Sequence, residues 1–120
     1  MLFDSSEESP GSEGLSIIPG KVIKFSEQKN LKVPHMGWNE VQIKNLDDPV
    51  WQKIDDLTHF YFVHSYFPKP DNPEVSSSTT GYGVDFTSSI RFGNIFGTQF
   101  HPEKSQKSGL RLIENFLKST

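Results

Sequence analysis

The run HFYFVHSYF, residues 59–67, constrains the fold more than any other stretch of the chain. Aromatic and β-branched residues favour extended backbone, and an unbroken apolar run of this length is typical of a strand buried on both faces. We therefore expect residues 59–67 to form a central strand. The segment PKPDNP that follows is expected to end it, because proline cannot donate to a hydrogen-bonded ladder.

Several shorter segments also have strand character. GKVIKF alternates apolar and basic residues, and KVPHMGWNEVQI is expected to turn at residues 34–37 and then continue as a strand. VSSSTTGYG and FTSSIRFGN are expected to be strands with polar outer positions. Residues 96–100 are expected to form another strand, joined to the preceding one by a hairpin turn at Gly93 and Asn94.

Two segments have helical patterns, and an acidic segment has neither a helical nor a strand pattern. DDPVWQKI predicts one helical turn, with Asp48 as N-cap and Pro49 at the first helical position. SQKSGLRLIENFLKS predicts an amphipathic helix, and DSSEESPGSEG, residues 4–14, a solvated loop. The side of the helix expected to be buried holds Leu110, Ile113, Phe116 and Leu117. Five or six strands and one terminal helix predict a mostly β member of the α/β class, with helix cover on one sheet face.

Composition excludes several functions for this chain of 120 residues, which is long enough for one small domain. The net charge is −3 and the basic residues are scattered, so nucleic acid is not an expected partner. No apolar run could span a bilayer and no signal sequence opens the chain, so we expect a cytoplasmic protein without membrane contact. Cysteine is absent, which excludes disulfides, thiolate metal sites and a cysteine nucleophile in this chain. The four histidines have no ligand-like spacing, so neither a metal nor another cofactor is expected.

The segment GTQFHPEKS contains the candidate catalytic residues, His101 and Glu103. Residues two apart in a strand point to the same side, so these side chains are expected to project together, with Pro102 stiffening the link. A carboxylate beside an imidazole orients the ring and stabilises its protonated form, so the second ring nitrogen can act as a general base. A surface pair without catalytic function is the alternative interpretation.

FGTQFHPEKS resembles the segment that closes the active site of class I glutamine amidotransferases. VPHMGWNEV, FYFVHSYF, SEGLSIIPGKVIKF and GTQFHPEKSQKSGLRLIENFL are together similar to the glutaminase subunits of imidazole glycerol phosphate synthases. The resemblance covers essentially all of residues 1–120. It implies the C-terminal half of a flavodoxin-like, doubly wound α/β domain of about 200 residues.

The resemblance also implies a reaction and a partner. The family hydrolyses the side-chain amide of glutamine through a Cys-His-Glu triad and a glutamyl thioester, and the ammonia passes to a cyclase subunit in histidine biosynthesis. By match to the motif, His101 is the base and Glu103 its orienting carboxylate, whereas Lys104 and Ser105 receive no chemical step. Ser65 and Tyr66 match the segment whose backbone binds glutamine; alternatively, they are a strand end and a core aromatic.

The PHMGWN run is the expected contact with the cyclase subunit. Met36 and Trp38 are suitable interface anchors, because methionine and tryptophan supply large apolar contact areas. The alternative is a packed turn with Trp38 in the core. The residues assigned to this interface are Pro34, His35, Met36, Gly37, Trp38 and Asn39.

The chain departs from the family in lacking the Gly-x-Cys-x-Gly elbow. MLFDSSEES is similar to the end of the helix after that elbow, so Met1 is expected to lie roughly five residues past the cysteine's place. Three interpretations remain open: a partial enzyme that is inactive alone, a non-catalytic module that docks on the cyclase, and the glutaminase portion of another synthase. If half of the family's sheet is absent, an unpaired strand edge and uncovered apolar faces would make the isolated chain marginally stable or oligomeric.

Overall fold

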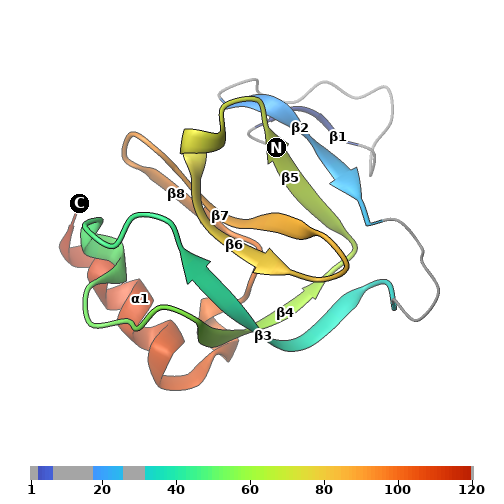
Figure 1. Cartoon of the computed structure of the whole chain (residues 1–120). Coiled ribbons are helices and arrows are strands. Elements are labelled where there is room, and N and C mark those ends of the chain that lie inside the picture. Colours follow the sequence, from blue (N-terminus) through green and yellow to red (C-terminus); the bar gives the residue numbers. More distant parts are fainter. Residues whose placement is uncertain (1–2, 7–17, 26–31, 120) are drawn as a thin grey trace.

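The computed structural model describes residues 3–6, 18–25 and 32–119 (Figure 1). This part of the chain forms eight strands, three short 3-10 helices and one α-helix, so the sequence underestimated the number of strands. The terminal helix was predicted correctly. The loop predicted for residues 4–14 is wrong at its start, because Phe3–Ser6 is strand β1 and not a loop or the end of a helix. The rest of that predicted loop lies outside the described residues.

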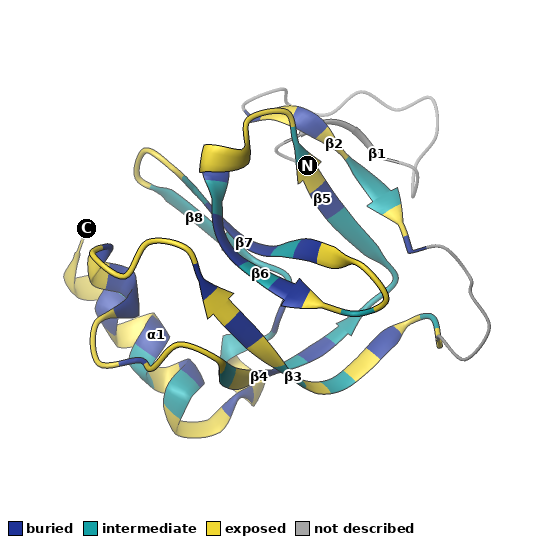
Figure 2. Cartoon of the chain, in the orientation of Figure 1, coloured by how far each residue is buried: buried dark blue, intermediate teal, exposed yellow. Residues whose placement is uncertain are grey.

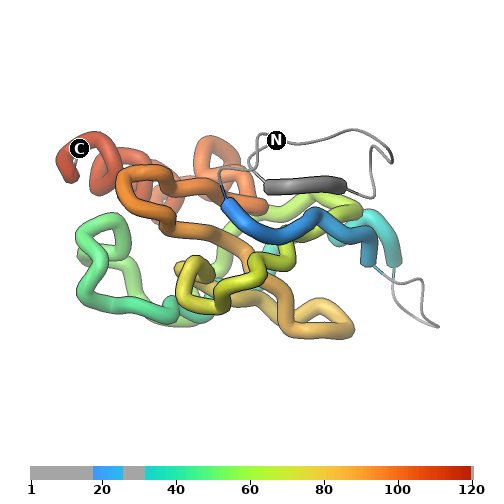
Figure 3. The backbone as a smooth tube through the Cα atoms, turned by 90° about the horizontal axis from the view of Figure 1, so that it is seen from above, coloured from blue at the N-terminus to red at the C-terminus, as the bar shows by residue number. Residues whose placement is uncertain are grey.

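The strands form two sheets, and all neighbouring strands are antiparallel except β1 and β2. The smaller sheet has the order β1 (Phe3–Ser6), β2 (Ile18–Lys24), β5 (Tyr66–Pro70). The larger has the order β4 (Thr58–His64), β3 (His35–Ile43), β6 (Ser76–Gly81), β7 (Asp85–Phe92), β8 (Ile95–Thr98). The short helices are η1 (Pro49–Trp51), η2 (Pro73–Val75) and η3 (Pro102–Lys104), and α1 is Gln106–Lys118. Two perpendicular views place α1 and β2 at opposite ends of the molecule (Figures 1 and 3).

The aromatic run 59–67 does not form the single central strand that was predicted. It divides at Ser65 into β4 of the larger sheet and β5 of the smaller one. Within β4 only Phe60 and Phe62 are fully buried, so the strand buries one face and not two. The expected break at PKPDNP comes later, because β5 continues to Pro70; an edge strand tolerates proline, since a missing N–H can face away from its neighbour.

The turn predicted for residues 34–37 is also wrong. His35 already pairs with His64, and Gly37 pairs with Phe62, so β3 begins at His35. Gly37 has φ 122°, a conformation that side chains disfavour, which explains the glycine without a chain reversal. The hairpin predicted at residues 93–94 is confirmed, since Phe92 pairs with Ile95 across it.

An aromatic-rich core joins the larger sheet to the helices. Buried positions line the inner faces of β3, β4, β6 and β7 and one side of α1 (Figure 2). The cluster consists of Phe25, Val41, Ile43, Val50, Trp51, Ile54, Phe60, Phe62, Phe86, Phe100 and Leu112. The chain has an apolar content of only 33%, and burying these large rings compensates for it, because each ring removes a large area from water.

Serines of β6 and β7 occupy the core, although the sequence predicted that polar residues of these strands face outward. Ser77, Ser78, Ser88 and Ser89 are all buried. The Ser78 hydroxyl lies 2.8 Å from that of Ser88, and the Trp51 indole N–H donates to the Ser77 hydroxyl at 2.9 Å. These pairings make burial tolerable, because a buried hydroxyl with a partner avoids most of its desolvation cost.

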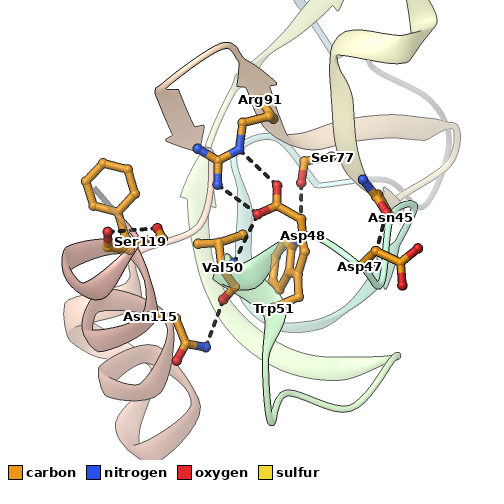
Figure 4. A network of polar contacts seen from close by, with 10 residues as sticks. Asn45, Asp47, Asp48, Val50, Trp51, Ser77, Arg91, Asn115 and Ser119 are labelled. Carbon is orange, nitrogen blue, oxygen red and sulfur yellow. Dashed lines mark hydrogen bonds and ion pairs between the residues drawn. The ribbon is translucent and has the colours of Figure 1, made fainter.

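One polar network attaches η1 to both β7 and α1 (Figure 4). The Asp48 carboxylate accepts the Val50 N–H at 3.0 Å, which confirms the predicted N-cap. The same carboxylate accepts two hydrogen bonds from Arg91, each 2.9 Å. Asn115 of α1 donates to the Val50 carbonyl at 2.9 Å, so one short turn connects three elements.

The α1 helix presents a different side to the core from the one predicted. Its buried residues are Gly109, Leu112 and Asn115, and Phe116 is partly buried. The predicted core residues Leu110, Ile113 and Leu117 are instead exposed, with relative accessibilities of 58%, 36% and 66%. The side of α1 that faces the core therefore combines Leu112 with Asn115, which bonds to η1, and Gly109, which lies against η3.

Candidate active site

His101 is fixed to β4 by its backbone. The preceding residue, Phe100, forms an isolated antiparallel bridge with Phe62, and the His101 N–H donates to the Tyr61 carbonyl at 2.9 Å. The chain then turns into η3, whose first residue is Pro102. Because β4 is a strand of the larger sheet, the imidazole is attached to a rigid element rather than to a free loop.

The His101 and Glu103 side chains meet, as the sequence predicted, but not through strand alternation, because Glu103 lies in the 3-10 helix η3 and His101 is its N-cap. The Nδ1 atom of His101 lies 2.8 Å from Oε1 of Glu103. The backbone N–H of Glu103 itself and then the His101 ring lower the pKa of this carboxyl below its usual value. Glu103 is therefore an anion at neutral pH and holds the ring through Nδ1, which leaves Nε2 as the nitrogen available for proton transfer.

A buried hydroxyl braces this segment from behind. Ser105 is only 1% exposed; its Oγ donates to the His101 carbonyl at 2.7 Å and accepts the Tyr61 N–H at 3.0 Å. Both ends of the His101 backbone are thus attached to β4, directly and through Ser105. Sequence reasoning missed this function because a serine before a helix usually indicates an N-cap, whereas the Ser105 side chain makes no capping bond.

Ser65 and Tyr66 form the corner where the chain passes from one sheet to the other, and we call these two residues the β4–β5 corner. Both are half-buried, so the interpretation of Tyr66 as a core aromatic is wrong. The Ser65 carbonyl accepts the Phe25 N–H at 3.0 Å, and the Tyr66 carbonyl lies 2.9 Å from Nδ1 of His64. Strand β4 holds His101 at Tyr61 and ends directly before Ser65, so one strand positions both groups.

The PHMGWN run alternates between surface and core. Met36 is 62% exposed and Trp38 46% exposed, so the alternative that buried Trp38 in the core is wrong. The Trp38 ring packs edge-on against Tyr61, with 6.0 Å between centroids. Pro34 is exposed, and Gly37 and Asn39 are half-buried. His35, which the sequence assigned to the interface, is instead buried at 3% exposure, because it takes the inward position of β3.

None of the helices in the described part of the chain combines the length and apolar character that a bilayer crossing requires.

Comparison with known proteins identifies the class to which this fold and site belong. The glutamine amidotransferase class-I family model matches residues 12–120, and the chain belongs to this family. The crystal structure of a putative GMP synthase protein from Thermoplasma acidophilum shares the fold. Its TM-score is 0.63 at 17% identity, over 82% of this chain and 47% of that one.

Three relatives that are much more similar in sequence are imidazole glycerol phosphate synthase subunits HisH. The Pyrococcus furiosus protein is 50% identical over 117 residues, covering 97% of this chain and 58% of the relative. The Campylobacter jejuni protein HisH 1 is 51% identical over 116 residues, covering 97% of this chain and 57% of the relative. The Methanocaldococcus jannaschii protein is 50% identical over 117 residues, covering 98% and 58%. The chain therefore spans less than three fifths of the length of these relatives.

Proposed function

We propose that this chain is the C-terminal part of the glutaminase subunit of an imidazole glycerol phosphate synthase. In this assignment residues 1–120 form part of a class I amidotransferase domain, and the nucleophile elbow lies outside them. The observation that carries the proposal is the contact between His101 Nδ1 and Glu103 Oε1 at 2.8 Å. It occurs on a segment attached to β4, in a chain about half identical to HisH proteins.

The proposed reaction uses the free nitrogen of His101. Nε2 removes the proton from a cysteine thiol, and the thiolate attacks the carboxamide carbon of glutamine. Collapse of the tetrahedral intermediate breaks the C–N bond, and the proton returns to the leaving nitrogen, which departs as ammonia. Water then hydrolyses the thioester to glutamate. Glu103 stabilises the imidazolium that forms in each proton transfer, because its carboxylate accepts the Nδ1–H.

The chain alone cannot complete this reaction, because it contains no cysteine. Without a thiolate no thioester forms, and without the elbow's backbone N–H the oxyanion loses a hydrogen-bond donor. We therefore expect no glutaminase activity from the isolated chain.

The remaining assignments concern the substrate and the partner. The backbone of Ser65 and Tyr66 binds the α-amino and carboxylate groups of glutamine. Pro34, Met36 and Trp38 contact the cyclase subunit, which receives the ammonia in the cytoplasm. Support for this contact comes from the exposure of two large apolar side chains on one strand, since such residues are frequent interface anchors.

A second candidate function is a module that docks on the cyclase without chemistry. The exposed Met36 and Trp38 favour this docking function, because the chain has these two apolar contact residues but has no cysteine nucleophile. The two functions differ in what they require of His101: docking does not need the imidazole, whereas glutaminase activity does.

A hybrid protein tests the proposed function. In it, this chain replaces the matching 117 residues of the Pyrococcus furiosus HisH protein, which supplies the remaining part of the domain. With the cyclase subunit present, the hybrid is expected to release glutamate and ammonia from glutamine, and the isolated chain is expected to release neither. Turnover by the isolated chain, or a folded hybrid that binds the cyclase but never hydrolyses glutamine, would contradict the proposal.

A further inference from the structure

Two histidines that have no place in the proposed reaction meet beside the aromatic core, where His35 is buried and His64 is half-buried. His35 of β3 and His64 of β4 are opposite one another in the antiparallel register. The Nδ1 atom of His35 lies 2.9 Å from Nε2 of His64, which is hydrogen-bonding distance. Each ring also has a hydrogen-bond partner on its other nitrogen, Asn39 for His35 and Tyr66 for His64. These partners determine the direction, from donor to acceptor, of each hydrogen bond in the series.

The Asn39 side chain determines that direction. Its Oδ1 accepts the Glu40 N–H at 2.7 Å, and its Nδ2 donates to the Gly81 carbonyl at 2.9 Å, so the amide orientation is fixed by two backbone groups. The second hydrogen on Nδ2 points to Nε2 of His35, 3.2 Å away. An amide nitrogen can only donate, and therefore Nε2 of His35 must be the acceptor.

The remaining protons follow in sequence. A neutral His35 that accepts at Nε2 carries its hydrogen on Nδ1 and donates it to Nε2 of His64. His64 then carries its own hydrogen on Nδ1, which donates to the Tyr66 carbonyl at 2.9 Å. The result is a series of three hydrogen bonds that all donate in the same direction, from half-buried Asn39 on β3 to the β4–β5 corner.

The surroundings favour the neutral form of both rings. Tyr82 and Phe62 stack on His35 with centroids 4.0 and 4.8 Å away, and Phe25 and Phe86 lie 5.2 and 5.1 Å from His64. Burial, and then the neighbouring His64, lowers the pKa of His35 to about 4. Burial also lowers the pKa of His64. The hydrogen bond to the Tyr66 carbonyl raises this pKa, and the charge on His101 lowers it further, so the net pKa is lowered. The titratable groups facing the pair are thus Tyr82 and His101.

We propose that His35 and His64 are positioning residues that hold the Tyr66 carbonyl, and with it the β4–β5 corner, and that the continuous series of hydrogen bonds from Asn39 to this corner exists only while both rings are neutral. Protonating His64 would set two N–H groups against each other across the pair, and protonating His35 would set one against the Asn39 amide. The consequence for glutamine rests on the proposed function, in which this corner binds the substrate. Asn39 lies on β3, the strand that carries the proposed cyclase contact. The series of hydrogen bonds therefore also links this face to the β4–β5 corner.

NMR spectroscopy of the 120-residue chain with ¹⁵N-labelled histidine tests the arrangement without any activity. At neutral pH we expect the Nδ1–H tautomer for both rings and a scalar coupling between Nδ1 of His35 and Nε2 of His64. The amide signals of the corner should move together with the His35 ring signals as the pH is lowered toward about 4. An Nε2–H tautomer or a charged ring at neutral pH for either histidine would overturn the proposal, whether or not the chain belongs to a glutaminase.

Two substitutions in the hybrid protein separate positioning from general stability. His64→Phe removes the donor to Tyr66, and we expect the KM for glutamine to rise about tenfold with a smaller change in kcat, a loss typical of one misplaced hydrogen bond. His64→Asn retains an N–H near the Nδ1 position and should restore most of the affinity. His59→Phe, at an exposed position of the same strand, is the control. Equal KM values for the His64→Asn and His64→Phe hybrids, or unmoved corner amides in the His64→Phe chain, would contradict the proposal.

Discussion

Gly109 of α1 lies so close to Pro102 of η3 that a Cβ at position 109 would be 1.8 Å from the Pro102 carbonyl oxygen. The same atom would lie 2.9 Å from the Ser105 Cβ. Since η3 follows His101 directly, this contact positions the helix against the backbone of the proposed catalytic segment. Glycine is required here for close approach and not for an unusual backbone conformation.

Gly109→Ala should therefore destabilise the protein, although alanine normally stabilises a helix relative to glycine by roughly 0.5–1 kcal/mol. A backbone oxygen cannot move aside as a flexible side chain can, so the free energy of unfolding should fall by about 1–3 kcal/mol. Urea denaturation measures the change. Lys107→Ala, at an exposed position of the same helix, is the control and should not destabilise. A Gly109→Ala chain as stable as the parent would contradict the observed contact.

Ser105→Ala removes the hydroxyl that bridges Tyr61 and His101. We expect a loss of about 1–3 kcal/mol in unfolding free energy, because the Tyr61 N–H loses its acceptor and the His101 carbonyl keeps only the Lys104 N–H as donor. Ser108→Ala, at a half-buried position of α1, should cost much less. Amide hydrogen exchange at Tyr61 provides a local measurement: it should accelerate in Ser105→Ala alone. Equal exchange in both variants would show that the hydroxyl does not protect this amide.

The ion pair between Asp48 and Arg91 predicts a specific dependence of stability on pH. Burial raises the pKa of the Asp48 carboxyl, but hydrogen bonds from Arg91 and the Val50 N–H more than offset this, so the net pKa is lowered. A carboxyl with a lowered folded pKa stabilises the protein above its unfolded pKa, near 4, and this contribution is lost as the pH falls through the folded value.

Arg91→Met should lower the unfolding free energy at pH 7 by about 3 kcal/mol, because a nearly buried carboxylate loses its partner. The difference from the parent should narrow as the pH falls from the unfolded pKa, about 4, through the lower folded pKa of Asp48, because the carboxyl then becomes neutral. Combining Arg91→Met with Asp48→Asn removes both charges and keeps a capping side chain, so the double variant should be more stable than Arg91→Met alone. Denaturant titrations at several pH values test this; a difference that stays constant down to pH 2 would contradict it.

The exposed apolar side of α1 predicts self-association of the isolated chain. Leu110, Ile113 and Leu117 lie on this side, and such patches commonly mark contact surfaces. Sedimentation velocity should show a mass that rises with concentration, and Leu110→Lys with Leu117→Lys should reduce the effect. Lys107→Glu controls for a change in charge. A sharp unfolding transition at high temperature that does not depend on protein concentration would show that the chain is stable without a second copy on this side of α1.

Local chemistry was sufficient to predict some features of this fold. The Asp48 cap, the hairpin at residues 93–94 and the shared direction of His101 and Glu103 each depend on residues within a few positions of one another. The conformational preferences of these short segments survive in the folded chain because tertiary contacts agree with them.

Features that depend on distant partners were not predictable. The serines of β6 and β7 are buried because they bond to each other and to Trp51, and nothing near them in sequence reveals this. The orientation of α1 depends on the Asn115 contact with Val50 of η1, 65 positions away. His35 was assigned to the cyclase interface because it belongs to the PHMGWN run, whereas its position opposite His64 places it inside.

The glutaminase activity of the hybrid protein with position 101 changed tests the central claim most directly. His101→Asn should lower kcat by about 1000-fold or more, because the general base is lost, and Glu103→Gln should lower it less, because an amide still accepts the Nδ1–H. His59→Asn, an exposed histidine on β4, should leave kcat unchanged. If the His101→Asn hybrid hydrolyses glutamine at nearly the rate of the unsubstituted hybrid, His101 is not the base and the proposed function is wrong.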